Sequence, residues 1–469
     1  MKRSIFNLIA SLLLLGLGWL VPHSIFKVSL ETSSSPDPAL SATLMSAPAP
    51  ESTTTPQVSP APTDLPGPER DPYGEVYFTI ITPKEYVPPA EPPVGVDEST
   101  ARLARLPGSC VVGLEICPAV ETIETPFNMK DVYRSDGGGL VWSPDGRYGL
   151  LVTHPEDELS TGKTKEELDR LASQSPSEFQ VNPSSLYIYD AELNAWQMVY
   201  RAERKFFYSP TWSLDGQWIA FQMLTSPWAF HPAQADDGIY LVRPDGSDVR
   251  QISAVNASIL GWVGNSLLLR QVNQPYPSLN TTFVMLSLDG KITPLFDSQR
   301  VAFYSLAPDG GSLLAADAQG ETTGLPIKSV DLLALDGSII QGFGAFSNSA
   351  TSIFPLVWSR DSSWVAFASS RRVYVGARTA QPSQGVQAGL PADGSVREVY
   401  IADDTYVSPS FWNFQFSADN KYLLMDVYDG MPRLMVVALE TGQANEVIWK
   451  DMYSSEQATS YSWRHSPEK

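Results

Sequence analysis

The chain has 469 residues, of which 52 are acidic and 32 are basic, so its formal net charge at pH 7 is −20. A protein this acidic repels the phosphates of nucleic acids and offers no basic patch to an anionic membrane surface, which excludes both as expected partners. Aromatic residues make up 11% of the chain, and long amphipathic helical patterns are nearly absent, so we expect an all-β fold.

Residues 1–28 have the pattern of an export signal. Lys2 and Arg3 precede an apolar stretch from Ile5 to Val21. At about 17 residues this stretch is longer than most signal-peptide cores and shorter than a spanning helix of ~20 residues. No Ala-x-Ala cleavage site follows, so a signal peptide and an uncleaved signal anchor both remain open, with the anchor favoured. In either case we expect the rest of the chain at the cell surface, in the periplasm or in the extracellular space, with membrane contact only through this segment.

Residues 29–71 form a second region of different composition. Pro, Ser, Thr and Ala dominate it, as in the run APAP at 47–50. Such a segment cannot bury enough apolar surface to fold, so we expect a disordered tether. The folded body is expected over residues 72–469.

Three strands are expected at the start of this body, at Gly74–Ile80, Cys110–Leu114 and Phe127–Tyr133. They read as the second, third and fourth strands of one sheet whose first strand is missing. A Pro-rich piece at 87–93 is expected to connect strands within this sheet.

Cys110 and Cys117 are the only cysteines in the chain. In an exported protein we expect them to form a disulfide, with free thiols as the alternative. In one straight strand they would lie roughly 23 Å apart, beyond the reach of a disulfide. A bridge therefore requires residues 111–116 to turn back, which would shift or shorten the strand expected there. Two cysteines offer too few ligands for a zinc site.

From residue 142 onward a short phrase recurs. An aromatic residue and Ser lead to Asp-Gly or a similar pair, and an apolar run follows. Asp and Gly at these positions favour a tight turn, so each copy predicts an antiparallel hairpin. The turn explains the Asp residues, and the alternating spacing of a calcium loop is absent. The first strands of the copies are expected at Trp142, Trp212, Trp262, Leu306, Trp358, Phe416 and Trp463.

A second hairpin follows most copies, as at Gly238–Ile252. Two linked hairpins make four strands, which is one blade of a β-propeller. The phrase W-S-P-D-G with its apolar run, followed by this second hairpin, resembles the TolB-type, WD-repeat-like propeller family over roughly residues 72–469. The resemblance implies an all-β propeller of four-stranded antiparallel blades and leaves the activity open.

The two ends of the repeat array predict how the ring closes. The strand around Trp463 has no later partners, and the sheet that begins at Gly74–Ile80 lacks a first strand. We therefore predict that the C-terminal strand pairs with the N-terminal blade, which gives seven blades and leaves no exposed sheet edge. A six-bladed ring is the alternative.

One helical insertion is expected at about residues 155–184. Residues 161–173 contain good helix formers, and Thr164 with Glu167 has the spacing of a capping box. A solvated surface helix is the simplest interpretation, and a lid or docking element on one face of the ring is the alternative.

Two loops carry candidate ligand contacts. His154 precedes a run of acidic residues, and Trp228 and His231 lie shortly before Asp236 and Asp237. Ordinary loop packing is the alternative interpretation for both loops. No catalytic, cofactor-binding or metal-binding residue is predicted, because G-x-S-x-G, H-E-x-x-H and the nucleotide-binding glycine patterns are absent.

The sequence thus predicts a monomeric, non-enzymatic propeller that binds or scaffolds an envelope or extracellular protein, or binds a small ligand. The alternatives are an enzyme that acts on glycans or peptides at the central funnel, and a purely structural display unit. The sequence ends six residues after Trp463, so we expect no hydrolase domain of the kind found in prolyl-oligopeptidase-like peptidases. An enzyme would bring the loops around His154 and His231 to one site with a raised carboxylate pKa.

Overall fold

The computed structural model describes residues 71–82, 100–113, 116–129, 132, 139–154, 183–203, 205–225, 234–274, 280–298, 302–318, 327–345, 356–369, 371–378, 396–402, 410–428, 432–449, 452 and 457–465. The expected export signal, almost all of the expected tether and residues 155–182 of the expected insertion lie outside these ranges. Among the described residues, no helix is long and apolar enough to cross a membrane.

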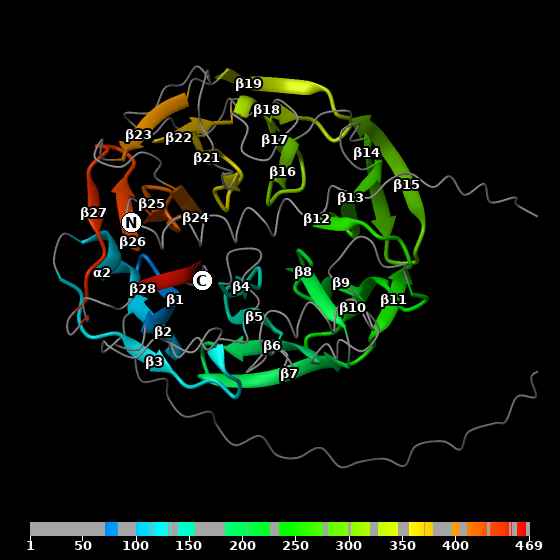
Figure 1. The fold of residues 1–469 in the computed structure, drawn as a ribbon, viewed down its shortest axis with the longest axis horizontal. Coiled ribbons are helices and arrows are strands. Elements are labelled where there is room, and N and C mark those ends of the chain that lie inside the picture. Colours follow the sequence, from blue (N-terminus) through cyan, green and yellow to red (C-terminus); the bar gives the residue numbers. More distant parts are fainter. Residues whose placement is uncertain are drawn as a thin grey trace, which may run out of the picture. The chain divides into compact units, whose positions relative to one another are not determined.

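Seven four-stranded antiparallel sheets are arranged as the blades of a β-propeller, which confirms the predicted all-β fold and the count of seven (Figure 1). The helix of the described part, α2, has five residues, Gly108–Val112. Blades 1 to 3 consist of β4 (Val141–Trp142), β5 (Tyr148–Thr153), β6 (Ser184–Asp190), β7 (Ala195–Ala202); β8 (Phe206–Trp212), β9 (Ile219–Leu224), β10 (Gly238–Val242), β11 (Arg250–Ser253); and β12 (Ser258–Val263), β13 (Ser266–Gln274), β14 (Asn280–Ser287), β15 (Ile292–Ser298).

The remaining blades continue around the ring in chain order, except that blade 7 combines both ends of the described chain. Blades 4 to 6 consist of β16 (Ala302–Leu306), β17 (Leu313–Ala318), β18 (Ile327–Leu333), β19 (Ile339–Ala345); β20 (Val357–Trp358), β21 (Trp364–Ser369), β22 (Arg372–Ala377), β23 (Val396–Ile401); and β24 (Ser410–Phe416), β25 (Tyr422–Tyr428), β26 (Pro432–Ala438), β27 (Ala444–Glu446). Blade 7 has the order β28 (Gln457–Arg464), β1 (Glu75–Thr82), β2 (Thr100–Pro107), β3 (Glu121–Ile123).

The recurring phrase forms the turn between the first and second strands of a blade. In blade 1, the Ser143 hydroxyl donates to the Asp145 carboxylate at 2.5 Å and accepts the N–H of Tyr148 at 2.9 Å. Gly146 follows with a φ of 70°, a backbone conformation that glycine adopts without strain. The side chains of Ser and Asp thus stabilise the turn itself by hydrogen bonds. The same pair of bonds recurs around Ser213, Ser359 and Ser417.

Tryptophans of the first strands join neighbouring blades. The indole N–H of Trp212 donates to the carbonyl of Val141 at 2.9 Å, and that of Trp358 donates to the carbonyl of Ser305 at 3.1 Å. In both cases the acceptor lies in the first strand of the preceding blade. The hydrophobic cores lie at these seams, because each blade packs its apolar face on the next.

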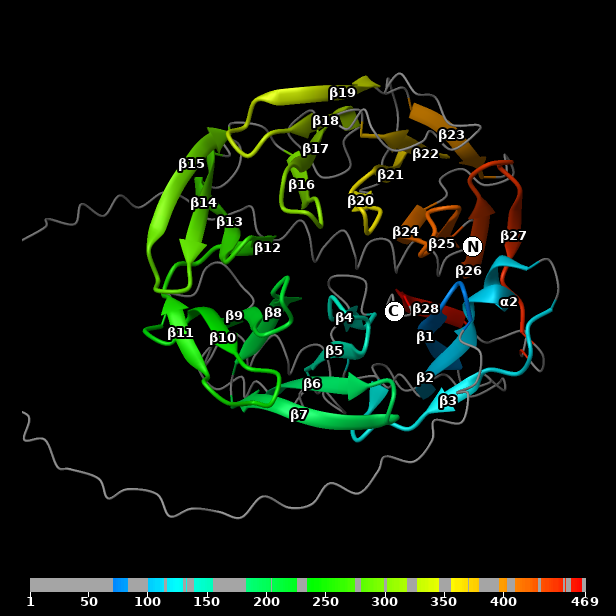
Figure 2. The same cartoon turned by 180° about the vertical axis from the view of Figure 1, so that it is seen from behind.

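The ring closes in blade 7 as predicted. β28 pairs with β1 in antiparallel register, with Trp463 opposite Val76, and both views of the ring show the two strands side by side (Figures 1 and 2). The Trp463 indole N–H donates to the carbonyl of Tyr73 at 2.6 Å, and Arg464 forms an ion pair with Glu75 at 2.6 Å. The last strand of the chain is therefore held to the first by backbone, indole and charge contacts.

The third and fourth strands predicted for this blade were misplaced. Residues 108–112, at the expected strand Cys110–Leu114, form α2, and the third strand is instead β2. The chain turns sharply at Gly108 because its N–H donates to the carbonyl of Gly74, at a site where a Cβ would lie 2.5 Å from the carbonyl oxygen of Tyr73. The structure joins Cys110 to Cys117 by a disulfide with a Cα–Cα distance of 5.4 Å.

The expected strand Phe127–Tyr133 adds no strand to blade 7, whose fourth strand is β3. The ring of Phe127 instead packs against Tyr187 and Trp196 of blade 1, with centroids 4.6 and 5.1 Å away. Val132 forms only an isolated bridge to Thr153. This segment therefore fills the seam between blades 7 and 1, because its apolar side chains contribute more there than at a sheet edge.

Candidate functional site

Three of the predicted ligand residues come together at the seam between blades 1 and 2. His154 follows β5, Asp236 and Asp237 precede β10, and Lys205, which precedes β8, lies among them. Together with Ser184, the first residue of β6, they form what we call the Lys205 cluster. Trp228 and His231 lie outside the described residues.

His154 is held in place on both sides of its ring. Nε2 donates to the carbonyl of Phe207 at 3.1 Å, and Nδ1 contacts the Ser184 hydroxyl. Ser184 has one proton to share between this nitrogen and the carbonyl of Lys205. Burial lowers the pKa of His154 to about 4, despite the bond to Phe207, so the ring is neutral at pH 7.

Lys205 joins the two acidic residues. Its ammonium lies 3.1 Å from the Asp237 carboxylate and 2.7 Å from that of Asp236. The side chains of Lys205 and Asp237 are 9% and 8% exposed, whereas that of Asp236 is 60% exposed. Asp237 therefore forms the buried half of this network, and Asp236 lies at its surface.

Asp237 is also bonded to the backbone around it. Its carboxylate accepts the N–H groups of Gln234 at 2.8 Å and Thr225 at 2.7 Å, and the Thr225 hydroxyl at 2.7 Å. Burial opposes ionisation, but these bonds and Lys205 outweigh it and hold the pKa of Asp237 below its ordinary value. The cluster thus fixes the backbone on both sides of residues 226–233, and His154 does so just before residue 155.

We expect Asp237→Ala to lower the free energy of unfolding by about 3–5 kcal/mol, because it leaves the buried Lys205 ammonium with the Thr225 hydroxyl and the exposed Asp236 carboxylate, without its buried counter-charge. The matched variant Asp236→Ala removes a carboxylate from the same ammonium at an exposed site and is expected to cost less than about 1 kcal/mol. Urea denaturation at pH 7 measures both. Equal losses would contradict the central place of Asp237 in the cluster.

Asp426, in β25, is a residue that the sequence analysis missed. Asn413 donates to its Oδ2 at 2.8 Å, while its buried Oδ1 has no hydrogen-bond partner in the described part of the chain. Burial raises the pKa of Asp426 to about 8, although the bond from Asn413 acts in the opposite direction. The carboxyl is therefore mostly protonated at pH 7. A lone acid in the apolar strand YLLMDVY was the signal in the sequence.

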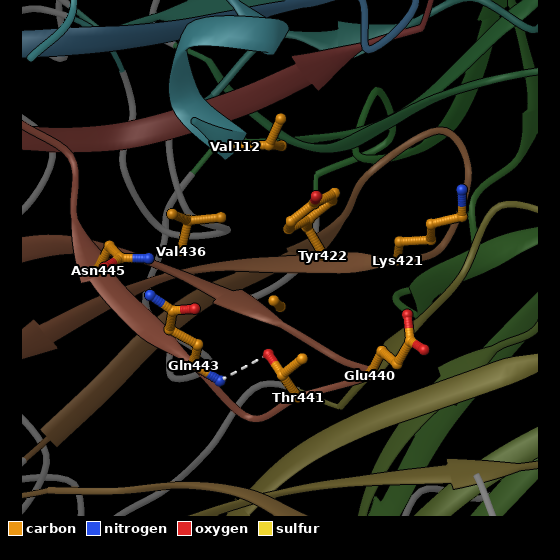
Figure 3. Close-up of a pocket in the computed structure, with 9 residues that line it drawn as sticks. Val112, Lys421, Tyr422, Val436, Glu440, Thr441, Gln443 and Asn445 are labelled. Atoms are coloured by element: carbon orange, nitrogen blue, oxygen red, sulfur yellow. Dashed lines mark hydrogen bonds between the residues drawn. The ribbon is translucent and has the colours of Figure 1, made fainter. Parts of the chain in front are cut away.

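A cavity of about 260 Å³ lies on the outer part of blade 6, where this blade meets α2 of blade 7 (Figure 3). Its wall includes Tyr422 and Val436, and Val112 of α2 lies across from them. No ligand residue was predicted here from the sequence. The lining also contains Lys421, Ala438, Glu440, Thr441, Gln443 and Asn445.

Metal coordination is not suggested by the described residues, in which no three His, Cys, Asp or Glu side chains gather as ligands. The Lys205 cluster contains two carboxylates, but a lysine ammonium occupies the position between them.

No family model and no curated protein matches the sequence. Among solved structures, TolB from Acinetobacter baumannii is 10% identical, with a TM-score of 0.39 over 84% of this chain and 67% of that one. An acylaminoacyl peptidase from Pyrococcus horikoshii is 12% identical, with a TM-score of 0.46 over 80% of this chain and 50% of that one. The β-propeller domain of Cps50 (Swd1) from Myceliophteria thermophila is 13% identical, with a TM-score of 0.43 over 68% of this chain and 89% of that one. This chain therefore spans about half the length of the peptidase that it matches.

Proposed function

We propose that this chain is an exported, non-enzymatic propeller that binds a protein or a small ligand at the cell envelope. The observation that carries the proposal is the Lys205 cluster, in which the predicted ligand residues His154 and Asp237 are bonded to the backbone and Asp237 is paired with Lys205. Such a cluster fixes loop ends on a rigid scaffold, which is how propellers and other repeat folds present binding surfaces.

The chemistry of the cluster favours binding over catalysis. A general acid or base at neutral pH needs a pKa near 7, but burial lowers the pKa of His154 to about 4. The carboxylate of Asp237 has its pKa held low, against the effect of burial, by hydrogen bonds from Gln234, Thr225 and Lys205. Neither group is suited to transfer a proton at pH 7, whereas both hold backbone in place.

Export is supported by the N-terminal pattern of the sequence, with Lys2 and Arg3 before an apolar stretch. A reporter enzyme that is active only outside the cytoplasm, fused after residue 71, tests this part. We expect activity with the natural N-terminus and none when residues 1–28 are deleted. Activity in neither fusion would contradict export.

Binding is tested with the full chain, tagged at its C-terminus and crosslinked in its own envelope. We expect one partner or ligand to be recovered with the wild type and with Glu446→Ala, an exposed change in blade 6, but about tenfold less with Asp237→Ala, whose loop ends are released. The propeller signal in circular dichroism shows that each variant is folded. Equal recovery with all three proteins would contradict a binding role for this face.

A second candidate function is an enzyme that acts on glycans or peptides. One observation favours it, the raised pKa of the buried Asp426 carboxyl, because a carboxyl that is protonated at pH 7 can act as a general acid. This function predicts that the full chain cleaves mixed polysaccharides or peptides and that Asp426→Asn abolishes the cleavage. The binding function predicts no product from either protein.

A further inference from the structure

The cavity of blade 6 has one apolar side built from Tyr422 and Val436. The Tyr422 ring is fixed by an edge-on contact with Tyr73, with centroids 5.9 Å apart and planes at 84°. Tyr422 is half-buried and Val436 is 2% exposed, so the ring presents a supported apolar surface to the cavity. A rigid aromatic ring of this kind binds flat, partly apolar groups at little cost in side-chain entropy.

Another side of the cavity carries polar side chains whose hydrogen-bonding groups are available to a ligand. Within the described residues, the side chains of Glu440, Gln443 and Asn445 form no hydrogen bond or ion pair, although all three line the cavity. Each amide offers two donors and an acceptor, and the carboxylate offers acceptors only. The Thr441 hydroxyl oxygen accepts the backbone N–H of Gln443 at 3.2 Å and keeps its own proton to donate (Figure 3).

The two kinds of wall point to one class of ligand. A pyranose ring has faces of C–H groups that stack on an aromatic ring, and hydroxyls around its edge that both donate and accept hydrogen bonds. At about 260 Å³ the cavity is smaller than the ~300–1,000 Å³ of sites for drug-sized ligands, so it has room for a single ring. Lys421 and Glu440 bring opposite charges to the lining, which gives no preference for a charged sugar.

We infer that this cavity binds one uncharged pyranose unit, either a free monosaccharide or the end of a neutral glycan. The inference goes beyond the proposed function, since it adds a sugar site to the binding propeller. It places the ligand at the seam of blades 6 and 7, apart from the Lys205 cluster at the seam of blades 1 and 2.

The disulfide loop completes the site from the side of blade 7. Val112, on the wall opposite Tyr422, belongs to α2, and Cys110 in the same helix is bonded to Cys117. The backbone N–H of Cys117 donates to the carbonyl of Ile448 in blade 6 at 2.8 Å. The bridge thus ties the helix that forms one wall to the blade that forms the other, which makes Cys110 and Cys117 positioning residues for the cavity.

The test is a binding titration of the full chain in detergent with glucose, galactose, mannose and N-acetylglucosamine, and with a neutral trisaccharide of each. We expect one of these series to bind with a Kd of about 1 mM, as is usual for ligands that make few contacts. Gln443→Ala and Asn445→Ala should each weaken binding about tenfold, since each removes a hydrogen-bonding group to the hydroxyls. Glu446→Ala, an exposed change on the same strand outside the cavity, should bind as the wild type does.

Two further measurements test the role of the disulfide and the source of the sugar. Replacing both Cys110 and Cys117 with Ser should weaken binding about tenfold while circular dichroism shows an intact propeller. Equal affinity for a monosaccharide and its trisaccharide indicates a site for a free sugar, and tighter binding of the trisaccharide indicates a glycan end.

Several results would overturn the inference. No binding of any sugar, or binding that Gln443→Ala and Asn445→Ala leave unchanged, removes the site. Binding of a neutral tripeptide in place of the sugars, lost in the same variants, shows that the ligand class is wrong. If the sugars do not bind but an envelope partner is still recovered in the crosslinking experiment, only this inference fails and the proposed binding function stands.

Discussion

At pH 7, Asp426→Asn is expected to be more stable than the wild type by up to about 4 kcal/mol, or about 1.36 kcal/mol for each pH unit above 3.8. The buried Oδ1 of Asp426 has no partner in the described part of the chain, and burial raises the pKa of the carboxyl to about 8. The unfolded chain ionises this group with a pKa near 3.8, so folding at pH 7 requires it to take up a proton. An amide has nearly the same shape and needs no such proton.

The free energy of unfolding of the wild type should depend on pH in a direction set by the pKa of Asp426 in the two states. Below pH 4 the carboxyl is protonated in both states and has no effect on the difference in stability. Between about pH 4 and pH 8 the unfolded state loses the proton first, so the free energy of unfolding of the wild type falls as the pH rises. Above about pH 8 both states are ionised and the curve is level again.

Urea denaturation of both proteins at one-unit steps from pH 4 to pH 9 measures this difference. The gap between Asp426→Asn and the wild type should grow up to about pH 8 and then stay constant. Glu446→Gln neutralises an exposed carboxylate of the same blade and should leave the wild-type curve almost unchanged. A gap that is independent of pH would show that Asp426 is ionised in the folded protein.

Trp463→Ala is expected to lower the free energy of unfolding by about 3–5 kcal/mol and, in addition, to open the ring. Trp463 is 2% exposed, donates its indole N–H to Tyr73 and lies opposite Val76 in the closing pair of strands. The first cost is the ordinary cost of a cavity in a core. The second arises because β28, once loosened, leaves β1 as an unpaired edge that can pair with another chain.

Trp358→Ala separates the two effects. Trp358 is 7% exposed and also donates its indole N–H to a carbonyl of the neighbouring blade, but β20 and β21 follow one another in the chain. Both variants should lose similar stability in chemical denaturation. Only Trp463→Ala should form dimers and larger species in size-exclusion chromatography, and dimers of both variants in equal amount would argue against a special role for the closing pair.

The repeat made most of the fold predictable. The Ser and Asp of each phrase bond to their own turn, so the signal is local and needs no knowledge of the rest of the chain. The closing strand was predictable for a different reason, since a first strand at Trp463 and a sheet without one at Gly74–Ile80 complete each other.

The errors lie where long-range packing decides the structure. Cys110 was placed in a strand because Val111 and Val112 suit one, but the chain turns at Gly108, which donates its N–H to Gly74 and has no space for a Cβ beside Tyr73. Phe127 was predicted to lie in a strand from its local sequence. In the structure its ring packs instead against Tyr187 and Trp196, which lie 60 or more residues later in the chain.

The candidate sites were only partly visible in the sequence. His154, Asp236 and Asp237 were recognised, but Lys205, which unites them, is an unremarked lysine between two strands. The residues of the blade 6 cavity come from β25, β26 and β27 and from the turns of these strands, with the exception of Val112 of α2, which lies more than 300 residues earlier in the chain. The residues of blade 6 match no known motif, and only the packing of blade 7 on blade 6 brings Val112 to them.

The pairing of β1 with β28 has a consequence for the making of the protein. Residues 75–82 leave the ribosome long before residues 457–464, and at 5–20 residues per second the delay is roughly 20–80 s. During that time the earlier strand lacks its neighbour, while the blades between them can form from contacts close in sequence. An unfinished chain therefore exposes an unpaired sheet edge, and a chaperone that covers this edge would improve the yield of closed rings.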